Sequence, residues 1–324
     1  MNGPAPRIWV LLGHRTGDNN QLLALAEALR LPFETRTLHF NLLRVFHHGL
    51  GASLLSLDRA GRRTIAPPWP DLIIGIGWRS VAAARWVKKI SGGRSKLVRL
   101  GDPRGAIAKF DLIITTPQYP VEEAPNVLRL PLGMSRFRKA PPPTESERTL
   151  LNALPRPHRL MAVGGPAKYW QLSPERVCAS ALRLAARDGT VIAVTSPRTP
   201  PDIASALQGV ERTNVRVITS REPRFPVLLT DADEIFVTGD SIAMLSEAVL
   251  SGKPVGIIPI DLSEEGQRVL GHDPSGNRDL RRFWASLRDR GLAGTIDRPA
   301  TGQLADPAAT AADAVKALLG DRVE

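Results

Sequence analysis

Residues 234–259 read EIFVTGDSIAMLSEAVLSGKPVGIIP, and this stretch decides the fold. Two short apolar runs, 234–237 and 255–259, flank a helical pattern that has the polar turns 238–241 and 251–254 at its two ends. The order strand, helix, strand predicts a βαβ unit with parallel strands. Its helix would begin past the carboxyl end of a strand, where free main-chain N–H groups and the helix dipole attract phosphate.

The same helix carries two polar side chains that suggest a ligand. Ser241 opens it and Glu247 follows six residues later, among Ile, Ala, Met, Leu and Val residues. We expect Glu247 to be a buried carboxylate, which needs a hydrogen-bond partner, and a sugar hydroxyl is one.

The length and composition are those of a globular protein with two domains. The chain has 324 residues, of which 43% are hydrophobic and 23% charged, and domains of about 150 residues are common. No apolar run approaches the roughly 20 residues of a membrane helix. The first apolar run, 8–12, is too short for a signal peptide and leads into a glycine loop, so we expect a cytoplasmic location.

Cysteine and histidine usage argues against disulfides and metals. Cys178 is the one cysteine, and the six histidines show no metal-ligand spacing. We therefore expect no disulfide framework, no metal site and no cofactor.

The net charge of +11 predicts anionic partners. The basic residues are dispersed and only 5% of residues are aromatic, which disfavours nucleic acid because single strands need stacking platforms. A nucleotide substrate and a peripheral contact with an anionic membrane, on the inner face of the cytoplasmic membrane, fit better. The alternative is a basic surface that is merely solvated.

Alternating strand and helix patterns predict an α/β protein with two tandem Rossmann-like, doubly wound domains and a helical C-terminal tail. We expect strands at 8–12, 34–39, 72–76, 96–100, 112–115, 126–130, 159–163, 190–195, 215–219, 234–237 and 255–259, and helices at 173–187, 201–208, 241–250, 276–290 and 307–319. The expected divisions are a first domain at 1–138, an extended proline-rich linker at 139–148, a second domain at 149–275 and the tail at 276–324, folded back on the first domain. Ligands of such sheets bind at the carboxyl ends of the strands, so two tandem domains predict a cleft there.

In the first domain, residues 13–21 form a glycine loop that opens a helix. Its spacing matches neither the dinucleotide nor the nucleoside-triphosphate motif. Asp18 or His14 could act as general base on an acceptor hydroxyl. The alternative for Asp18 is a helix N-cap, with Gln21 completing a capping box. Gly77 and Arg79 follow a strand and suit an anion; the alternative, which the pattern slightly favours, is a tight turn with a solvated Arg79.

In the second domain, two further loops after strands suit a diphosphate. Gly164 and Gly165 permit close approach of a pyrophosphate, and Lys168 supplies charge. The loop at 195–200 adds two hydroxyls and the Arg198 guanidinium.

The chain resembles the "elongated mitochondria" (ELM) family in the motifs at 17–21, 164–165, 195–200 and 238–255, a likeness that spans about 8–260. Bacterial members of that family are regarded as glycosyltransferases and plant members as mitochondrial-fission factors. The family in turn is similar to glycosyltransferases with two Rossmann domains (GT-B), including the enzyme that adds N-acetylglucosamine to the peptidoglycan lipid precursor.

The resemblance implies an acceptor domain at 1–138, a nucleotide-sugar domain at 149–275 and roles for individual residues. Gly164, Gly165, Ser196, Asp240 and Ser241 would meet the diphosphate of a donor, and Glu247 its ribose. The first-domain loop differs from the denser glycine-histidine loop of the lipid-precursor enzyme, which puts the acceptor and the base in question. The expected catalytic residues are Asp18, our choice for the base, and His14; the expected substrate-binding residues are Gly17, Asn19, Asn20, Gly77, Arg79, Gly164, Gly165, Lys168, Ser196, Arg198, Thr199, Asp240, Ser241, Met244 and Glu247.

The leading hypothesis is a glycosyltransferase that moves a sugar from a nucleotide sugar to a lipid-linked or envelope saccharide acceptor. The first alternative is a non-catalytic, membrane-associated interaction protein of the mitochondrial-fission type. The second is a sugar-nucleotide epimerase on the same scaffold. Polar groups in the 13–21 loop favour chemistry over scaffolding.

Overall fold

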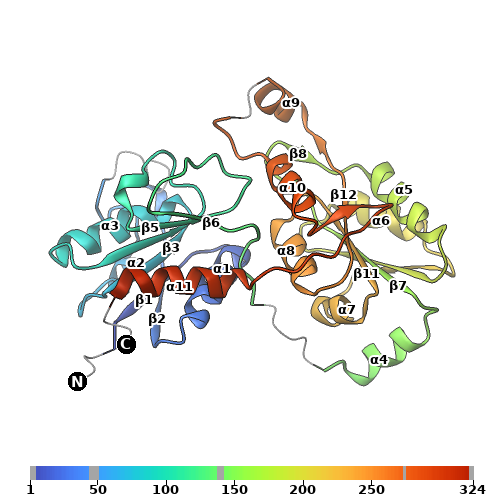
Figure 1. Ribbon diagram of the computed structural model, residues 1–324, viewed down its shortest axis with the longest axis horizontal. Coiled ribbons are helices and arrows are strands. Elements are labelled where there is room, and N and C mark those ends of the chain that lie inside the picture. Colours follow the sequence, from blue (N-terminus) through green and yellow to red (C-terminus); the bar gives the residue numbers. More distant parts are fainter. Residues whose placement is uncertain (1–4, 44–50, 137–141, 273–274, 321–324) are drawn as a thin grey trace. The chain divides into compact units, whose positions relative to one another are not determined.

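The computed structural model describes residues 5–43, 51–136, 142–272 and 275–320. The chain divides into two compact units: Met1–Arg136 with Ala305–Glu324, and Phe137–Leu304. Each unit is built on a six-stranded sheet whose paired strands are all parallel (Figure 1). The expected α/β architecture with two doubly wound units is confirmed.

The first unit has the strand order β2-β1-β3-β4-β5-β6. Its strands are β1 (Ile8–Leu12), β2 (Phe33–Thr37), β3 (Leu72–Ile76), β4 (Lys96–Leu100), β5 (Leu112–Thr115) and β6 (Val127–Arg129). Its α-helices are α1 (Thr16–Ala28), α2 (Arg59–Arg63), α3 (Val81–Ile90) and α11 (Pro307–Leu319), with 3-10 turns at Trp78–Ser80 and Ile107–Lys109.

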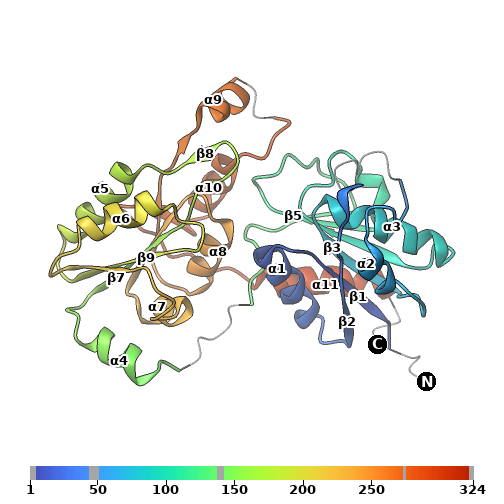
Figure 2. The ribbon, with the colours of Figure 1, turned by 180° about the vertical axis from the view of Figure 1, so that it is seen from behind.

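Both faces of this sheet are covered because successive strand side chains point to opposite sides. Ile8 and Val10 pack into one core with α1 and α11, and Trp9 and Leu11 pack into the opposite core with α3. Helix α11 comes from the far end of the chain and lies beside α1, as both ribbon views show (Figures 1 and 2).

The second unit has the strand order β10-β9-β7-β11-β12-β14. Its strands are β7 (His158–Val163), β9 (Thr190–Thr195), β10 (Val215–Ile218), β11 (Glu234–Thr238), β12 (Val255–Ile258) and β14 (Gly294–Thr295), and a small antiparallel pair joins β8 (Trp170–Gln171) to β13 (Asp261–Leu262). Its helices are α4 (Glu145–Asn152), α5 (Pro174–Ala185), α6 (Pro201–Gly209), α7 (Phe225–Asp231), α8 (Ile242–Leu250), α9 (Glu264–Leu270) and α10 (Leu280–Asp289). Strands β8, β13 and β14 were not predicted, because two residues are too few for a periodic signal.

Two segments differ from the sequence expectation. Residues 145–148 of the expected extended linker are helical, because Thr144 and Glu147 form a capping box that starts α4; residues 139–141 lie outside the described part. The expected tail, 276–324, is divided: α10 belongs to the second unit and α11 to the first.

Candidate functional site

Three loops of the second unit follow neighbouring strands at the carboxyl edge of the sheet. They are residues 164–165 after β7, 196–199 after β9 and 239–241 after β11. The chain runs outward from β7 to β10 on one side and then from β11 to β14 on the other. The loops after β7 and β11 therefore flank the topological switch point, where doubly wound sheets bind ligands.

Asp240 ties these three loops together. Its carboxylate accepts hydrogen bonds from the Thr238 hydroxyl (2.6 Å) and the Gly165 N–H (3.0 Å), and it pairs with Arg198 Nη2 at 2.9 Å. The Asp240 side chain is 0% exposed, whereas that of Arg198 is 52% exposed. Burial raises the pKa of the Asp240 carboxyl above its usual 3.8, and the hydrogen bonds and Arg198 oppose that rise. Asp240 thus faces its own protein, and Arg198 is the group presented outward.

The two glycines before this edge are required by packing. A Cβ at Gly164 would lie 2.1 Å from an Asp240 carboxylate oxygen, and one at Gly165 would lie 2.0 Å from the Arg198 carbonyl oxygen. No side chain fits at either position without moving the Asp240 cluster. The Gly-Gly pair is therefore needed by the fold, in addition to any closeness it allows to a phosphate.

The hydroxyls of the 196–199 loop hold the loop in place. Thr199 Oγ1 donates toward the carbonyls of Val163 (2.9 Å) and Gly164 (2.6 Å) and accepts from the Ser196 N–H at 2.9 Å. Ser196 Oγ accepts from the Arg198 N–H at 3.2 Å. Lys168 is exposed, with its ammonium 4.4 Å from the centre of the Tyr169 ring.

Helix α8 begins at this edge. Ser241 is its N-cap, and the Ser241 hydroxyl accepts from the Met244 N–H at 3.4 Å. Glu247 is only half-buried, because the buried face of α8 consists of Leu245, Ser246, Ala248 and Val249. The prediction of a buried Glu247 is wrong, and the buried carboxylate of this stretch is Asp240.

Sequence reasoning did not identify Trp284 as a neighbour of this edge. Its indole N–H donates to the Gly239 carbonyl at 2.9 Å, and a Cβ at Gly239 would lie 2.6 Å from its ring. Trp284 lies on α10, 45 residues away from Gly239, and no local pattern links the two. Thr238 was quoted in the turn without a role, although it is fully buried and bonds both Asp240 and the Gly164 N–H.

The first unit has an equivalent edge. Its chain runs from β1 to β2 on one side and from β3 to β6 on the other, so its switch point lies between β1 and β3. A pocket of about 110 Å³ opens there, and its lining includes His14, Asp18, Gly77 and Arg79. Arg79 Nη1 lies 3.3 Å from both ring nitrogens of His14. The structure thus brings together both expected catalytic residues and the expected anion-binding pair.

The glycine loop of this unit is shorter than predicted. Helix α1 begins at Thr16, so residues 17–21 are helical, and its N-cap is Arg15 without a side-chain bond. Asp18 lies in the first turn, so the alternative in which Asp18 caps the helix is wrong. Asn19 closes the turn instead, since its side-chain amide exchanges 2.9 Å bonds with the N–H and the carbonyl of Gly13. Gly17 and Asn20 lie at the exposed start of the helix.

Arg99 holds the Gly77 turn from inside the protein. It lies at the end of β4, is buried, and donates to the carbonyls of Gly77 and, at 2.8 Å, Asp102. Burial lowers the pKa of its guanidinium to about 10, so Arg99 remains charged at neutral pH. Gly77 has a φ of +69°, which favours glycine. A charged residue within the apolar run 96–100 was the signal that could have identified Arg99.

The described ranges contain neither a cluster of metal-ligating side chains nor a helix that could span a membrane. Across residues 5–43, 51–136, 142–272 and 275–320, no three His, Cys, Asp or Glu side chains gather as they would around a metal ion. None of the helices in those ranges has the length and apolarity to cross a bilayer.

Two parallel, doubly wound units, each with polar loops at its switch point, define the GT-B class of fold. Solved structures of that class match the chain almost end to end. The proposed UDP-N-acetylglucosamine 2-epimerase of Listeria monocytogenes is 13% identical, with a TM-score of 0.55 over 99% of this chain and 97% of the other. A UDP-glucosyltransferase from Polygonum tinctorium is 11% identical, with a TM-score of 0.52 over 97% and 98%. At such identities the likeness describes the fold alone.

Within that class, the chain belongs to the Mitochondrial fission ELM1 family, whose family model matches residues 16–319. The mitochondrial fission protein ELM1 of Arabidopsis thaliana is 24% identical in an alignment 280 positions long, and the alignment covers 74% of this chain. The match spans 62% of the length of the plant protein.

Proposed function

We propose that this protein is a glycosyltransferase that moves a sugar from a nucleotide sugar to a lipid-linked or envelope saccharide acceptor. The observation that carries the proposal is the Asp240–Arg198 pair at the second-unit switch point. A buried carboxylate holds a guanidinium that is half exposed at the edge where sheets of this class bind ligands. A positioned cation is what a departing nucleoside diphosphate requires.

The donor would lie at the second-unit edge. Arg198, the Lys168 ammonium and the N-terminus of α8 would share the diphosphate charge, without a metal ion. Glu247, half-buried on α8, would accept from the ribose hydroxyls. UDP in the names of both structural neighbours supports a uridine nucleotide as the first candidate.

The acceptor would lie at the first-unit pocket. Asp18 would act as the general base on the acceptor hydroxyl, and the His14–Arg79 pair would bind an anionic group of the acceptor. We also propose a cytoplasmic location with peripheral contact to the inner face of an anionic membrane, because the net charge is +11.

A thermal-shift screen against UDP, GDP, CMP and their sugars tests the donor proposal. A ligand present at 100 times its dissociation constant should stabilise the folded protein by about 2.7 kcal/mol. The shift should be lost in Arg198→Gln and in Glu247→Ala. It should persist in Arg183→Gln, a matched control because Arg183 also pairs with an aspartate, Asp297, on the exposed surface. No shift with any nucleotide would refute the donor site.

Two alternatives have an observation in their favour. The name of the plant relative favours a non-catalytic, membrane-associated fission-type protein, for which no nucleotide should shift the melting temperature. The Listeria neighbour favours a sugar-nucleotide epimerase. Incubation with labelled donor separates them: a transferase labels an acceptor, whereas an epimerase yields a new nucleotide sugar without any acceptor.

A further inference from the structure

Exposed leucines gather at one place on the first unit. Leu42, Leu43 and Leu55 are three of the five large apolar side chains that are exposed within the described residues, and Leu42 is 86% exposed. The two segments are tied together, because the Asn41 side-chain amide donates to the Leu55 carbonyl at 2.8 Å. These leucines face water although they sit on a stretch that the fold holds in place.

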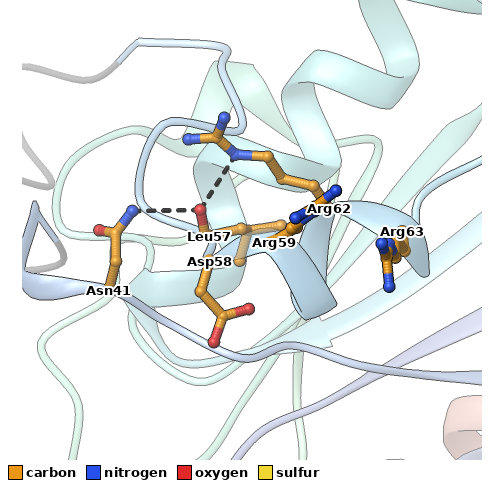
Figure 3. A pocket seen from close by; sticks show the side chains of 6 residues that line it. All are labelled: Asn41, Leu57, Asp58, Arg59, Arg62 and Arg63. Carbon is orange, nitrogen blue, oxygen red and sulfur yellow. Dashed lines mark hydrogen bonds between the residues drawn. The ribbon is translucent and has the colours of Figure 1, made fainter.

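Three arginines flank these leucines. Arg59, Arg62 and Arg63 lie on α2 at positions i, i+3 and i+4, which share one face of a helix. Arg62 Nε and the Asn41 amide both donate to the Leu57 carbonyl, at 3.0 and 3.1 Å (Figure 3). On the opposite face of α2, Gly61 packs closely against the main chain of His39: a Cβ at Gly61 would lie 2.5 Å from the His39 carbonyl oxygen.

The surface around α2 is a wide depression of about 630 Å³. It is lined by Asn41, Leu57, Asp58, Arg59, Arg62 and Arg63 (Figure 3). The single acid, Asp58, accepts from the Gly61 N–H at 2.8 Å as the cap of α2. Within the described ranges, none of the three arginines forms an ion pair. The patch is therefore strongly cationic as well as apolar.

We propose that this leucine–arginine patch (Leu42, Leu43, Leu55, Arg59, Arg62 and Arg63) docks on the surface of an anionic lipid bilayer. Leucine side chains enter the boundary between headgroups and acyl chains, and guanidinium groups bind lipid phosphates. The patch combines three guanidinium groups with three exposed leucines, and the acid beside them, Asp58, caps α2. This composition favours a lipid surface over an acidic protein.

The patch adjoins the first-unit pocket. Leu38 and Phe40 line that pocket, Asn41 follows directly in the chain, and Phe40 pairs with Leu57 across an antiparallel bridge. One segment thus lines the pocket and then carries the exposed leucines. The inference rests on the membrane contact proposed above and adds where it occurs: docking would bring a lipid-linked acceptor to the pocket containing His14 and Asp18.

Vesicle flotation of the full chain tests the proposal. Wild type should float with vesicles of equal parts phosphatidylglycerol and phosphatidylcholine, and not with phosphatidylcholine alone. Arg59→Gln/Arg63→Gln should weaken partitioning about 30-fold, since each arginine near an anionic leaflet contributes about fivefold. Leu42→Ser/Leu55→Ser should weaken it about tenfold.

Matched controls are available on the second unit. Arg288→Gln/Arg290→Gln removes the same charge from exposed positions, and Leu182→Ser removes an exposed leucine. Both should partition within about twofold of wild type, because neither change touches the leucine–arginine patch. A probe attached at Leu42→Cys in a Cys178→Ser background should shift its emission to the blue on anionic vesicles. Because Leu42 is so exposed, these variants should fold even if an arginine variant does not.

Each remaining outcome overturns the proposal. If wild type does not bind anionic vesicles, both the patch and the membrane contact are refuted. The thermal-shift screen then tests the glycosyltransferase proposal independently. If the patch variants bind vesicles like wild type, or if the control variants lose as much vesicle binding as the patch variants, the membrane contact does not lie at this patch. That outcome leaves the membrane contact itself standing.

Discussion

The two units have the same kind of switch point but fill it differently. In the second unit, Asp240 is fully buried and joins Thr238, Gly165 and Arg198 in one bonded cluster. In the first, Arg79 Nη1 lies 3.3 Å from the ring nitrogens of His14, and both residues line a pocket of about 110 Å³. The second-unit edge is thus built around a buried carboxylate, whereas the pocket at the first-unit edge has the exposed His14 in its lining.

The largest effect should come from the first-unit pocket and should concern rate. Asp18→Asn should slow transfer of labelled sugar to a lipid fraction by about 100- to 10,000-fold, because general base catalysis contributes that much. The melting temperature should change little, since asparagine keeps the size of Asp18 and the residue is not the N-cap of α1. Normal transfer by this variant would contradict the role of Asp18 as the base, and a large loss of stability would contradict the contrast between the edges.

The next effect should be on stability and should occur at the second-unit edge only. Gly165→Ala should lower the free energy of unfolding by about 3 kcal/mol, because its Cβ would meet the Arg198 carbonyl oxygen. Urea denaturation followed by tryptophan fluorescence measures this. Gly17→Ala is the matched control: its Cβ meets nothing within 4 Å, so it should be neutral or gain up to about 1 kcal/mol. If Gly165→Ala and Gly17→Ala lowered the free energy of unfolding equally, the two edges would not differ in packing.

A smaller effect is expected on nucleotide affinity. Asp240→Asn should weaken binding of the nucleotide selected by the thermal-shift screen about tenfold, because Arg198 loses its charged partner. Titration calorimetry measures it. Asp202→Asn, in the first turn of α6, is an exposed control that should bind normally. Unchanged affinity in Asp240→Asn would mean that Arg198 needs no positioning.

The smallest effect should be a dependence of stability on pH. The Asp240 carboxyl titrates near 3.8 when unfolded and at a higher pH when folded, because burial raises its pKa. Its contribution to the free energy of unfolding is therefore full below 3.8 and falls as the pH rises through the folded pKa. Subtracting the unfolding free energies of Asp240→Asn from those of wild type between pH 3 and 7 isolates this fall. A difference that increases with pH would contradict it.

The sequence predicted the strands of the two large sheets except β14, together with the switch-point loops and the α8 segment, because these depend on local periodicity and turn residues. It did not predict which carboxylate is buried. Glu247 lies among apolar neighbours in the chain, but the helical period turns it partly outward, while Asp240 in a polar turn is enclosed by other loops. Arg99 and Trp284 reach their edges through tertiary packing, which no local pattern records.

Helix α11 has a consequence for the order of assembly. Ala308, Ala311 and Val315 complete the core that Leu22 and Leu25 of α1 begin, almost 300 residues earlier. A ribosome releases the second unit, Phe137–Leu304, before it releases α11. The unit that is synthesised first is therefore the one that finishes folding last, and until then the apolar face of α1 must be kept from other partners.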